Sequence, residues 1–206
     1  AAITTLFLWW FSTGIILWRV RVADNGTAQD HINSVIIGLP LLALGAAATR
    51  VSLADLSANG IYLAFLGALA LWGWIELAFL SGVVTGPNRV PCPPFARTSQ
   101  RFWRAVGTIA WHETLLVVVL CALGLLTMGA ENPFALGTFA LLFFARVSAK
   151  LNLFFGVPRI NTQFLPKPLS HLPSHFRIGR ITAFFPISVS ALTVFSALLL
   201  ERAINV

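Results

Sequence analysis

Long apolar runs separated by shorter polar segments recur along the whole chain. Six of these runs are close to the length of about 20 residues that an α-helix needs to cross the hydrocarbon core of a bilayer. The predicted spans cover residues 2–18, 32–49, 58–81, 104–128, 134–156 and 181–203. The pattern therefore predicts an all-α fold, a polytopic membrane helix bundle of about six transmembrane helices that forms a single transmembrane domain over residues 1–206.

The composition agrees with a protein that lies mostly in lipid. Hydrophobic residue types make up 57% of the 206 residues and charged types 10%, with a mean hydropathy of +0.83. A soluble domain carries about 25% charged residues, so this chain has too few charges to cover a water-facing surface. No basic segment precedes the first apolar run, so we expect a retained helix there rather than a cleaved signal peptide.

The basic residues predict the orientation of the bundle. Ten of the 14 Lys and Arg residues fall on one side of the predicted spans: Arg19, Arg21, Arg89, Arg97, Arg101, Arg104, Arg159, Lys167, Arg177 and Arg180. Only Arg50 and Arg202 fall on the other side. The positive-inside rule then makes the loops 82–103 and 157–180 cytoplasmic and places both termini in the periplasm of a bacterial inner membrane. We attribute the basic excess to topology and anionic lipid rather than to nucleic acid, because the loops lack basic stripes interleaved with stacking aromatics.

Tryptophans support this layout. Trp18, Trp72, Trp74 and Trp103 all lie near the predicted cytoplasmic ends of their spans. The amphipathic indole favours the membrane–water interface, so we expect these four side chains to anchor the bundle there.

Ionisable residues inside the spans are the main candidates for function, because a charge in a bilayer is costly. The third span contains Glu76, the fourth contains His112 and Glu113, and the fifth contains Arg146 and Lys150. At about 1.5 Å per helical residue, all of them lie in the cytoplasmic half of the bilayer. We therefore expect Arg146 and Lys150 to meet Glu76 or Glu113 in a buried polar cluster.

The fifth span carries further polar residues on another face. Ser148 and Asn152 lie nearly opposite Arg146 and Lys150 on the helix. Polar groups on two faces indicate that this helix lies inside the bundle, so we expect Asn152 to belong to the same buried polar cluster as Glu76, Glu113, Arg146 and Lys150.

The cluster has several interpretations. It can fix which helices pack together, or it can form a ligand or catalytic site. No metal site is predicted, because the adjacent His112 and Glu113 diverge by about 100° on a helix and the Glu-x-x-His pattern of di-iron bundles is absent. A neutral His112 in an apolar, aromatic-rich span is a candidate ligand for the central metal of a haem or chlorin.

The two long loops are rich in proline. Residues 85–94 predict an extended, stiff segment rather than a helix. In the second loop, His171 and His175 are four residues apart, but Pro173 between them argues against a shared helical face and a paired ligand site. Both loops are therefore interpreted as partner-docking surface.

The residues quoted so far also carry a resemblance to a known family. Over nearly its whole length the chain resembles the PuhE family, the photosynthetic-complex assembly proteins of purple-type phototrophic bacteria. The most specific stretch is Arg-Val-Ser-Ala-Lys-Leu-Asn-Leu-Phe at 146–154. The other matching stretches are residues 9–14, 72–76, 79–82, 85–87, 91–93, 112–113, 156–158, 164–166 and 185–189, together with Arg89. The chain departs from the family at Ile75, where a histidine is common, and this weakens a metal site on the third span.

The resemblance implies an assembly factor or accessory subunit of the photosynthetic core complex. Its expected partners are the reaction centre and the LH1 light-harvesting antenna, with bacteriochlorophyll, carotenoid and lipids as the expected bound molecules. No catalytic activity is securely attached to the family. We expect the transmembrane surface to pack on partner helices through small residues, namely Ala43, Ala47, Ala64 and Ala68.

Two alternatives remain. A membrane enzyme acting on a tetrapyrrole or isoprenoid intermediate would use His112 or Glu113 in its chemistry. A small transporter would show internal repeats or broken helices, but the two halves of the chain show no convincing similarity and Pro40 is a weak break.

Overall fold

The computed structural model describes residues 2–204, most of which are helical. The α-helices are α1 (Ala2–Asp24), α2 (Ala28–Ile37), α3 (Leu39–Ser52), α4 (Ala58–Leu80), α5 (Thr98–Leu126), α6 (Phe134–Phe155) and α7 (Phe184–Ile204). Two short 3₁₀ helices, η1 (Lys167–Leu169) and η2 (Leu172–His175), lie in the loop before α7. Six helical segments are long and apolar enough to cross a membrane, with α2 and α3 together forming one of them. The predicted fold class is confirmed.

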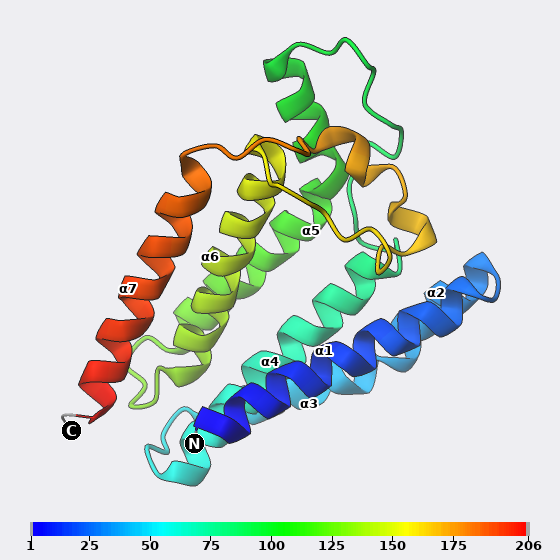
Figure 1. Cartoon of the computed structure of the whole chain (residues 1–206). Helices are drawn as coiled ribbons and strands as arrows, with labels where there is room; N and C mark the ends of the chain where they lie inside the picture. Colours follow the sequence, from blue (N-terminus) through cyan, green and yellow to red (C-terminus); the bar gives the residue numbers. More distant parts are fainter. Residues whose placement is uncertain (1, 205–206) are drawn as a thin grey trace.

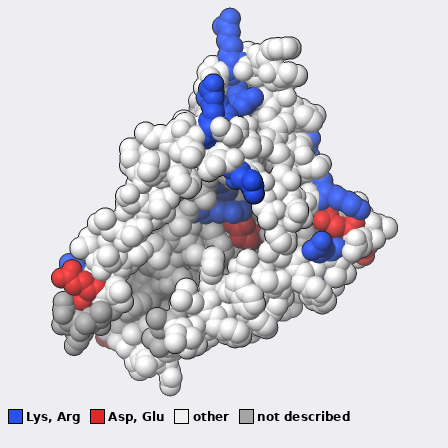
Figure 2. All heavy atoms as spheres, in the orientation of Figure 1, with Lys and Arg blue, Asp and Glu red and all other residues white. Residues whose placement is uncertain are grey.

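The helices run between two ends of an elongated bundle (Figure 1). Both termini lie near one end, and the two long loops, 81–97 and 156–183, lie at the other. Most of the basic side chains visible in Figure 2 lie toward the end that carries these loops. The arrangement fits an even number of crossings, and the assignment of the loop end to the cytoplasm stays a prediction.

The central helix is α4, which packs against α3, α6 and α1. Small residues allow α3 and α4 to approach closely: a Cβ added to Gly67 would lie 2.9 Å from the Thr49 backbone nitrogen and 3.0 Å from the Gly45 carbonyl oxygen. Ala64 and Ala68 are fully buried in this core. The expectation that both face partner helices is therefore wrong, because they serve the packing of the chain's own helices.

The rest of the core lies between α4, α5 and α6. Leu116, Leu123 and Phe139 are almost completely buried there. The Trp72 ring packs edge-on against Phe139, with ring centroids 5.3 Å apart. The prediction of Trp72 as an interface anchor is therefore wrong, since α4 is surrounded by other helices and its indole faces them.

The other three tryptophans differ in their surroundings. The Trp74 indole nitrogen donates a hydrogen bond to the Val35 carbonyl oxygen at 3.1 Å, so this side chain links α4 to α2. Trp18 and Trp103, by contrast, are 65% and 70% exposed. Only these last two have the exposure that an interface anchor requires.

Two helices extend beyond their predicted ends. α1 continues past residue 18 to Asp24, because Arg19 and Arg21 favour helix while marking the end of the apolar run. α5 begins at Thr98 rather than 104, and the Arg97 backbone nitrogen donates to the Gln100 side-chain oxygen at 3.2 Å, which satisfies one backbone donor at the start of the helix. Hydropathy locates the apolar part of a helix and misses its polar first or last turns.

Two other boundaries also differ from prediction. The second span begins at Ala28 and is divided at Gly38, because Pro40 lacks the N–H that would continue the helical hydrogen bonds. Gly38 nevertheless keeps a helical backbone, and its N–H donates to the Ser34 carbonyl oxygen at 3.1 Å, so the break is weak, as expected. α7 begins at Phe184 rather than 181, with Pro186 in its first turn, where proline is tolerated.

The proline-rich loop after α4 is not helical, as predicted, and lies against the backbone of α5. The Asn88 backbone nitrogen donates to the Gly107 carbonyl oxygen at 3.0 Å, and the His112 backbone nitrogen donates to the Thr85 carbonyl oxygen at 3.0 Å. Between these two bonds, a Cβ added to Gly86 would lie 2.1 Å from the Gly107 oxygen. Only glycine permits this contact of loop and helix.

We therefore expect Gly86→Ala to lower the stability of the bundle. The added methyl group forces the loop away from α5 and should cost about 1–3 kcal/mol, as other overpacked sites do. Thermal unfolding of the purified protein in detergent measures this loss. The matched control is Gly124→Ala on α5, where an added Cβ has no neighbour within 4 Å. Equal melting temperatures for both variants would contradict the close contact at Gly86.

Candidate functional site

The ionisable residues of the predicted spans meet where α4, α5 and α6 approach one another. Arg146 Nη2 donates to Glu76 Oε2 at 2.9 Å, and Lys150 Nζ donates to Glu113 Oε1. His112 Nε2 lies 3.7 Å from Glu76 Oε1 and 3.9 Å from Glu113 Oε1. We call these five residues the charge cluster.

The helix geometry explains how the charge cluster forms. Arg146 and Lys150 are one turn apart on α6, so they lie on the same face. Each pairs with a carboxylate from a different helix, Glu76 on α4 and Glu113 on α5. The two ion pairs therefore tie α6 to both neighbours. With His112 neutral, the formal charges of the cluster sum to zero, which suits a site of low dielectric constant.

His112 is enclosed by the cluster. Its side chain is fully buried, and its ring packs on Phe79 with centroids 4.3 Å apart. Phe79 is the last residue but one of α4, so the cluster lies at the end of the bundle that carries the two long loops. An axial ligand of a chlorin needs open space at its nitrogen, whereas His112 Nε2 faces two carboxylates. The residues present do not fit the predicted tetrapyrrole ligation.

Asn152 does not belong with the charge cluster. Its Nδ2 donates to the Ser148 carbonyl oxygen at 3.1 Å and to Ser188 Oγ at 2.9 Å. Ser188 lies on α7, so this buried amide links α6 to α7. Its inclusion in the same cluster is corrected here, because its face of α6 looks toward a different helix.

Two cavities are lined by Arg146. The lateral groove, of about 370 Å³, lies among α1, α4 and α6 and is also lined by Glu76. The loop-covered chamber, of about 290 Å³, lies beneath the 156–183 loop between α5 and α6 and is also lined by Lys150. Figure 2 shows a hollow between α1 and α7 with acidic and basic side chains together in its floor. The Arg146 side chain thus lies between the lateral groove and the loop-covered chamber, both of which are largely apolar.

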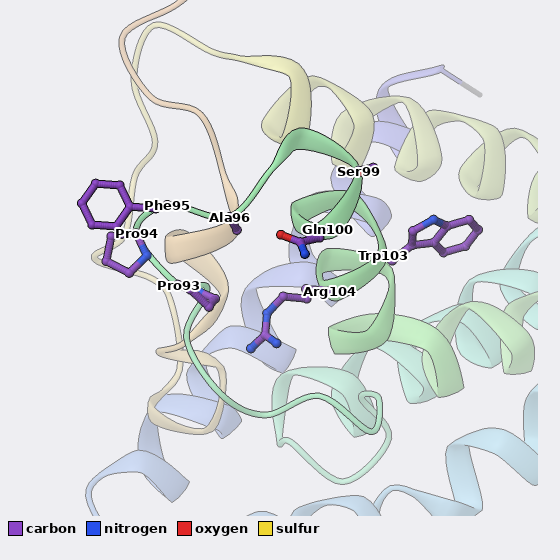
Figure 3. Close-up of a pocket in the computed structure, with 8 residues that line it drawn as sticks. All are labelled: Pro93, Pro94, Phe95, Ala96, Ser99, Gln100, Trp103 and Arg104. Carbon is purple, nitrogen blue, oxygen red and sulfur yellow. The ribbon is translucent and has the colours of Figure 1, made fainter.

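A third depression, of about 730 Å³, lies away from the charge cluster, where the proline-rich loop joins α5. In Figure 3, Phe95 points away from the helix, Trp103 points to the helix's far side, and Arg104 lies between them. Phe95 is 97% exposed. Arg104 is the only charged residue in its lining. We therefore assign no catalytic role to this depression.

The two histidines of the 156–183 loop are buried. His175 is completely buried and His171 is 8% exposed. Burial lowers the pKa of His171, and the positive charge of Arg89 lowers it further. Burial also lowers the pKa of His175, with Arg104 acting in the same direction. Both side chains are therefore neutral parts of the loop's packing.

Sequence reasoning missed this buried side of the loop. Leu165, Leu169, Leu172 and Phe176 line the loop-covered chamber. Their spacing of three to four residues is the signal that would have found them, since it places apolar side chains on one face. The prolines of this loop indicate only that the segment is stiff, and they do not show which of its side chains are buried.

These features define a multi-pass membrane protein in which partly buried ion pairs link neighbouring helices of the bundle. The chain belongs to the family described as a protein of unknown function (DUF3623), whose model matches residues 1–206. It is 58% identical over 202 residues to an uncharacterized 30.4 kDa protein in the puhA 5′ region of Rhodobacter capsulatus, covering 98% of this chain and 74% of that relative. No solved structure matches the chain.

We expect Glu76→Gln to destabilise the bundle by leaving Arg146 without its carboxylate. The pair is only partly buried, so the loss should lie near 2 kcal/mol, between the values for exposed and buried pairs. Thermal unfolding in detergent reports it, and Glu131→Gln, at an exposed loop residue, is the matched control. In the double variant Glu76→Gln, Arg146→Gln the two losses should not add, because each breaks the same pair. Full additivity would contradict the pairing.

Stability should also fall with acid because of the loop histidines. Their folded-state pKa values are lowered, so below about pH 6.5 the unfolded chain binds protons that the folded chain does not. The free energy of unfolding then decreases by up to about 1.4 kcal/mol per pH unit for each histidine. Unfolding measured from about pH 8 to 5 should show a shallower decline for His175→Gln. An unchanged pH slope would contradict this account.

Proposed function

We propose that this chain is an integral membrane assembly factor or accessory subunit of the photosynthetic core complex, formed by the reaction centre and its LH1 antenna. The observation that carries the proposal is the 58% identity to a protein whose name places it in the puhA 5′ region of Rhodobacter capsulatus. The resemblance to the PuhE family points to the same process. The site of action is then the bacterial inner membrane, with the loops in the cytoplasm.

The outer surface of α1 supports a role in binding membrane partners. Trp10, Phe11, Ile15 and Trp18 surround a groove of about 200 Å³ with Gly14 in its lining. A Cβ added to Gly14 would have no neighbour within 4 Å, and Trp10 is 69% exposed. We call this surface the α1 groove.

The α1 groove has the features of a helix-docking site. A small residue lets two helix backbones approach closely in the membrane, where van der Waals contact rather than hydrophobic burial drives association. The surrounding aromatic side chains supply large contact areas at low conformational cost. The occupant that we assign to it is a transmembrane helix of the core complex.

Pigment handling would follow from this partnership. His112 is enclosed by the charge cluster and does not fit a pigment ligand, so bacteriochlorophyll or carotenoid would be contacted at the lipid-facing surface, beside the partner that holds it. The charge cluster then holds the bundle together while the outer helices bind.

Gly14→Leu tests this function. The larger side chain fills the α1 groove without touching the chain's own helices, so we expect several-fold less reaction centre and antenna protein to co-purify with the tagged variant from host membranes. Accumulation of the variant itself should match the wild type. Gly124→Leu on α5, where an added Cβ also has no neighbour within 4 Å, is the control and should retain the partners.

Two outcomes would contradict the proposal. If the wild-type chain brings down no core-complex protein, the partnership fails. If His112→Ala accumulates normally but abolishes turnover of a tetrapyrrole or isoprenoid intermediate, the membrane-enzyme alternative replaces it.

A further inference from the structure

The loop-covered chamber is an apolar space with hydrogen-bond donors in one wall. Apolar side chains from α4, α5, α6 and the 156–183 loop form most of it, among them Phe102, Leu153 and Phe176. Arg146 and Lys150 line it, whereas their carboxylate partners do not. The charged groups that a molecule inside the chamber would meet are therefore donors. The lining also includes Thr108, whose hydroxyl donates to the Ala105 carbonyl oxygen, and Asn161, whose Oδ1 already accepts from the Gln163 backbone nitrogen.

Arg146 retains donors for such a molecule. The guanidinium has five N–H groups, and its one recorded hydrogen bond among the described residues is the bond from Nη2 to Glu76. Its buried Nε has no partner in that part of the chain. Nη1 also makes no hydrogen bond among the described residues, and unlike Nε it is not buried. An acceptor oxygen in the space that Arg146 lines can therefore satisfy it.

The charge balance selects the kind of acceptor. The cluster's two carboxylates and two cations already sum to zero with His112 neutral, so an anion in the chamber would add an uncompensated buried charge. A neutral carbonyl oxygen accepts from Arg146 or Lys150 without changing that sum. An apolar chamber of about 290 Å³, at the small end of the about 300–1,000 Å³ range of ligand sites, accommodates a head group and the start of its chain.

We propose that the loop-covered chamber binds a neutral amphiphile through a carbonyl oxygen that accepts a hydrogen bond from Arg146 or Lys150. A glycerolipid ester and a long-chain quinone share this chemistry. The site is separate from the α1 groove, so it stands or fails independently of the proposed partnership.

The first test measures ligand-induced stabilisation. Protein stripped of lipid is held in dodecyl maltoside, which has no carbonyl group, and its melting temperature is measured with four probes: a monoacylglycerol, a decyl-substituted benzoquinone, palmitate and dodecanol. We expect at least one carbonyl probe to raise the melting temperature by about 3–6 °C at tenfold its Kd. The probe that does so distinguishes ester from quinone. A larger rise with palmitate, or an equal rise with dodecanol, would overturn the proposal.

The second test locates the site. Ala105 lines the chamber, so Ala105→Phe should fill it and abolish the temperature shift. Ala122→Phe introduces the same side chain at an exposed position of the same helix and should keep the shift. A full shift in Ala105→Phe would overturn the assignment.

A crosslinking measurement on the wild-type chain keeps the test decisive if Ala105→Phe fails to fold. A photoactivatable analogue of the active carbonyl probe should label peptides from 102–109 and 165–176, which border the chamber. Labelling confined to the exposed faces of α1 and α7 would show general lipid contact and overturn the site.

Discussion

The structure depends on the cost of leaving a charge alone in a medium of low dielectric constant. Arg146 and Lys150 on α6 can lie inside the bundle only because carboxylates reach them from α4 and α5. Hydrophobic burial gives little direction to helix association in lipid, since acyl chains are as apolar as leucine. The ion pairs supply that direction: they decide which face of α6 turns inward and which two helices stand beside it.

The same physics explains which parts of the structure could be predicted. The lengths of the apolar runs predict the six spans. The shared depth of Glu76, His112 and Lys150 predicts that they meet, because a charged side chain at that depth is costly unless it is paired. The helix ends were less predictable. Arg19 and Arg97 mark where lipid gives way to water, but helices continue through that boundary and end where backbone hydrogen bonds are satisfied by caps and loops.

Side chains that suit more than one environment or partner were not predictable from their position in the sequence alone. Trp72 suits an interface and a core equally well, and only the central place of α4 decides for the core. Asn152 was assigned to the right helix but its partner, Ser188, comes from the last helix of the chain. The burial of His175 depends on the path of a loop whose prolines specify stiffness but not direction. In each case the deciding information is the arrangement of other elements.

The distance along the chain between the partners of the Glu76–Arg146 pair has a consequence for how the protein is made. The two residues are 70 positions apart, so at about 5–20 residues per second of synthesis Glu76 emerges several seconds before its cation exists. During that time α4 and α5 carry two carboxylates and no basic partner from α6. The nascent chain therefore passes through a state in which these carboxyl groups must be protonated or remain in contact with water. Arrival of α6 ends that state by giving each carboxylate a cationic partner.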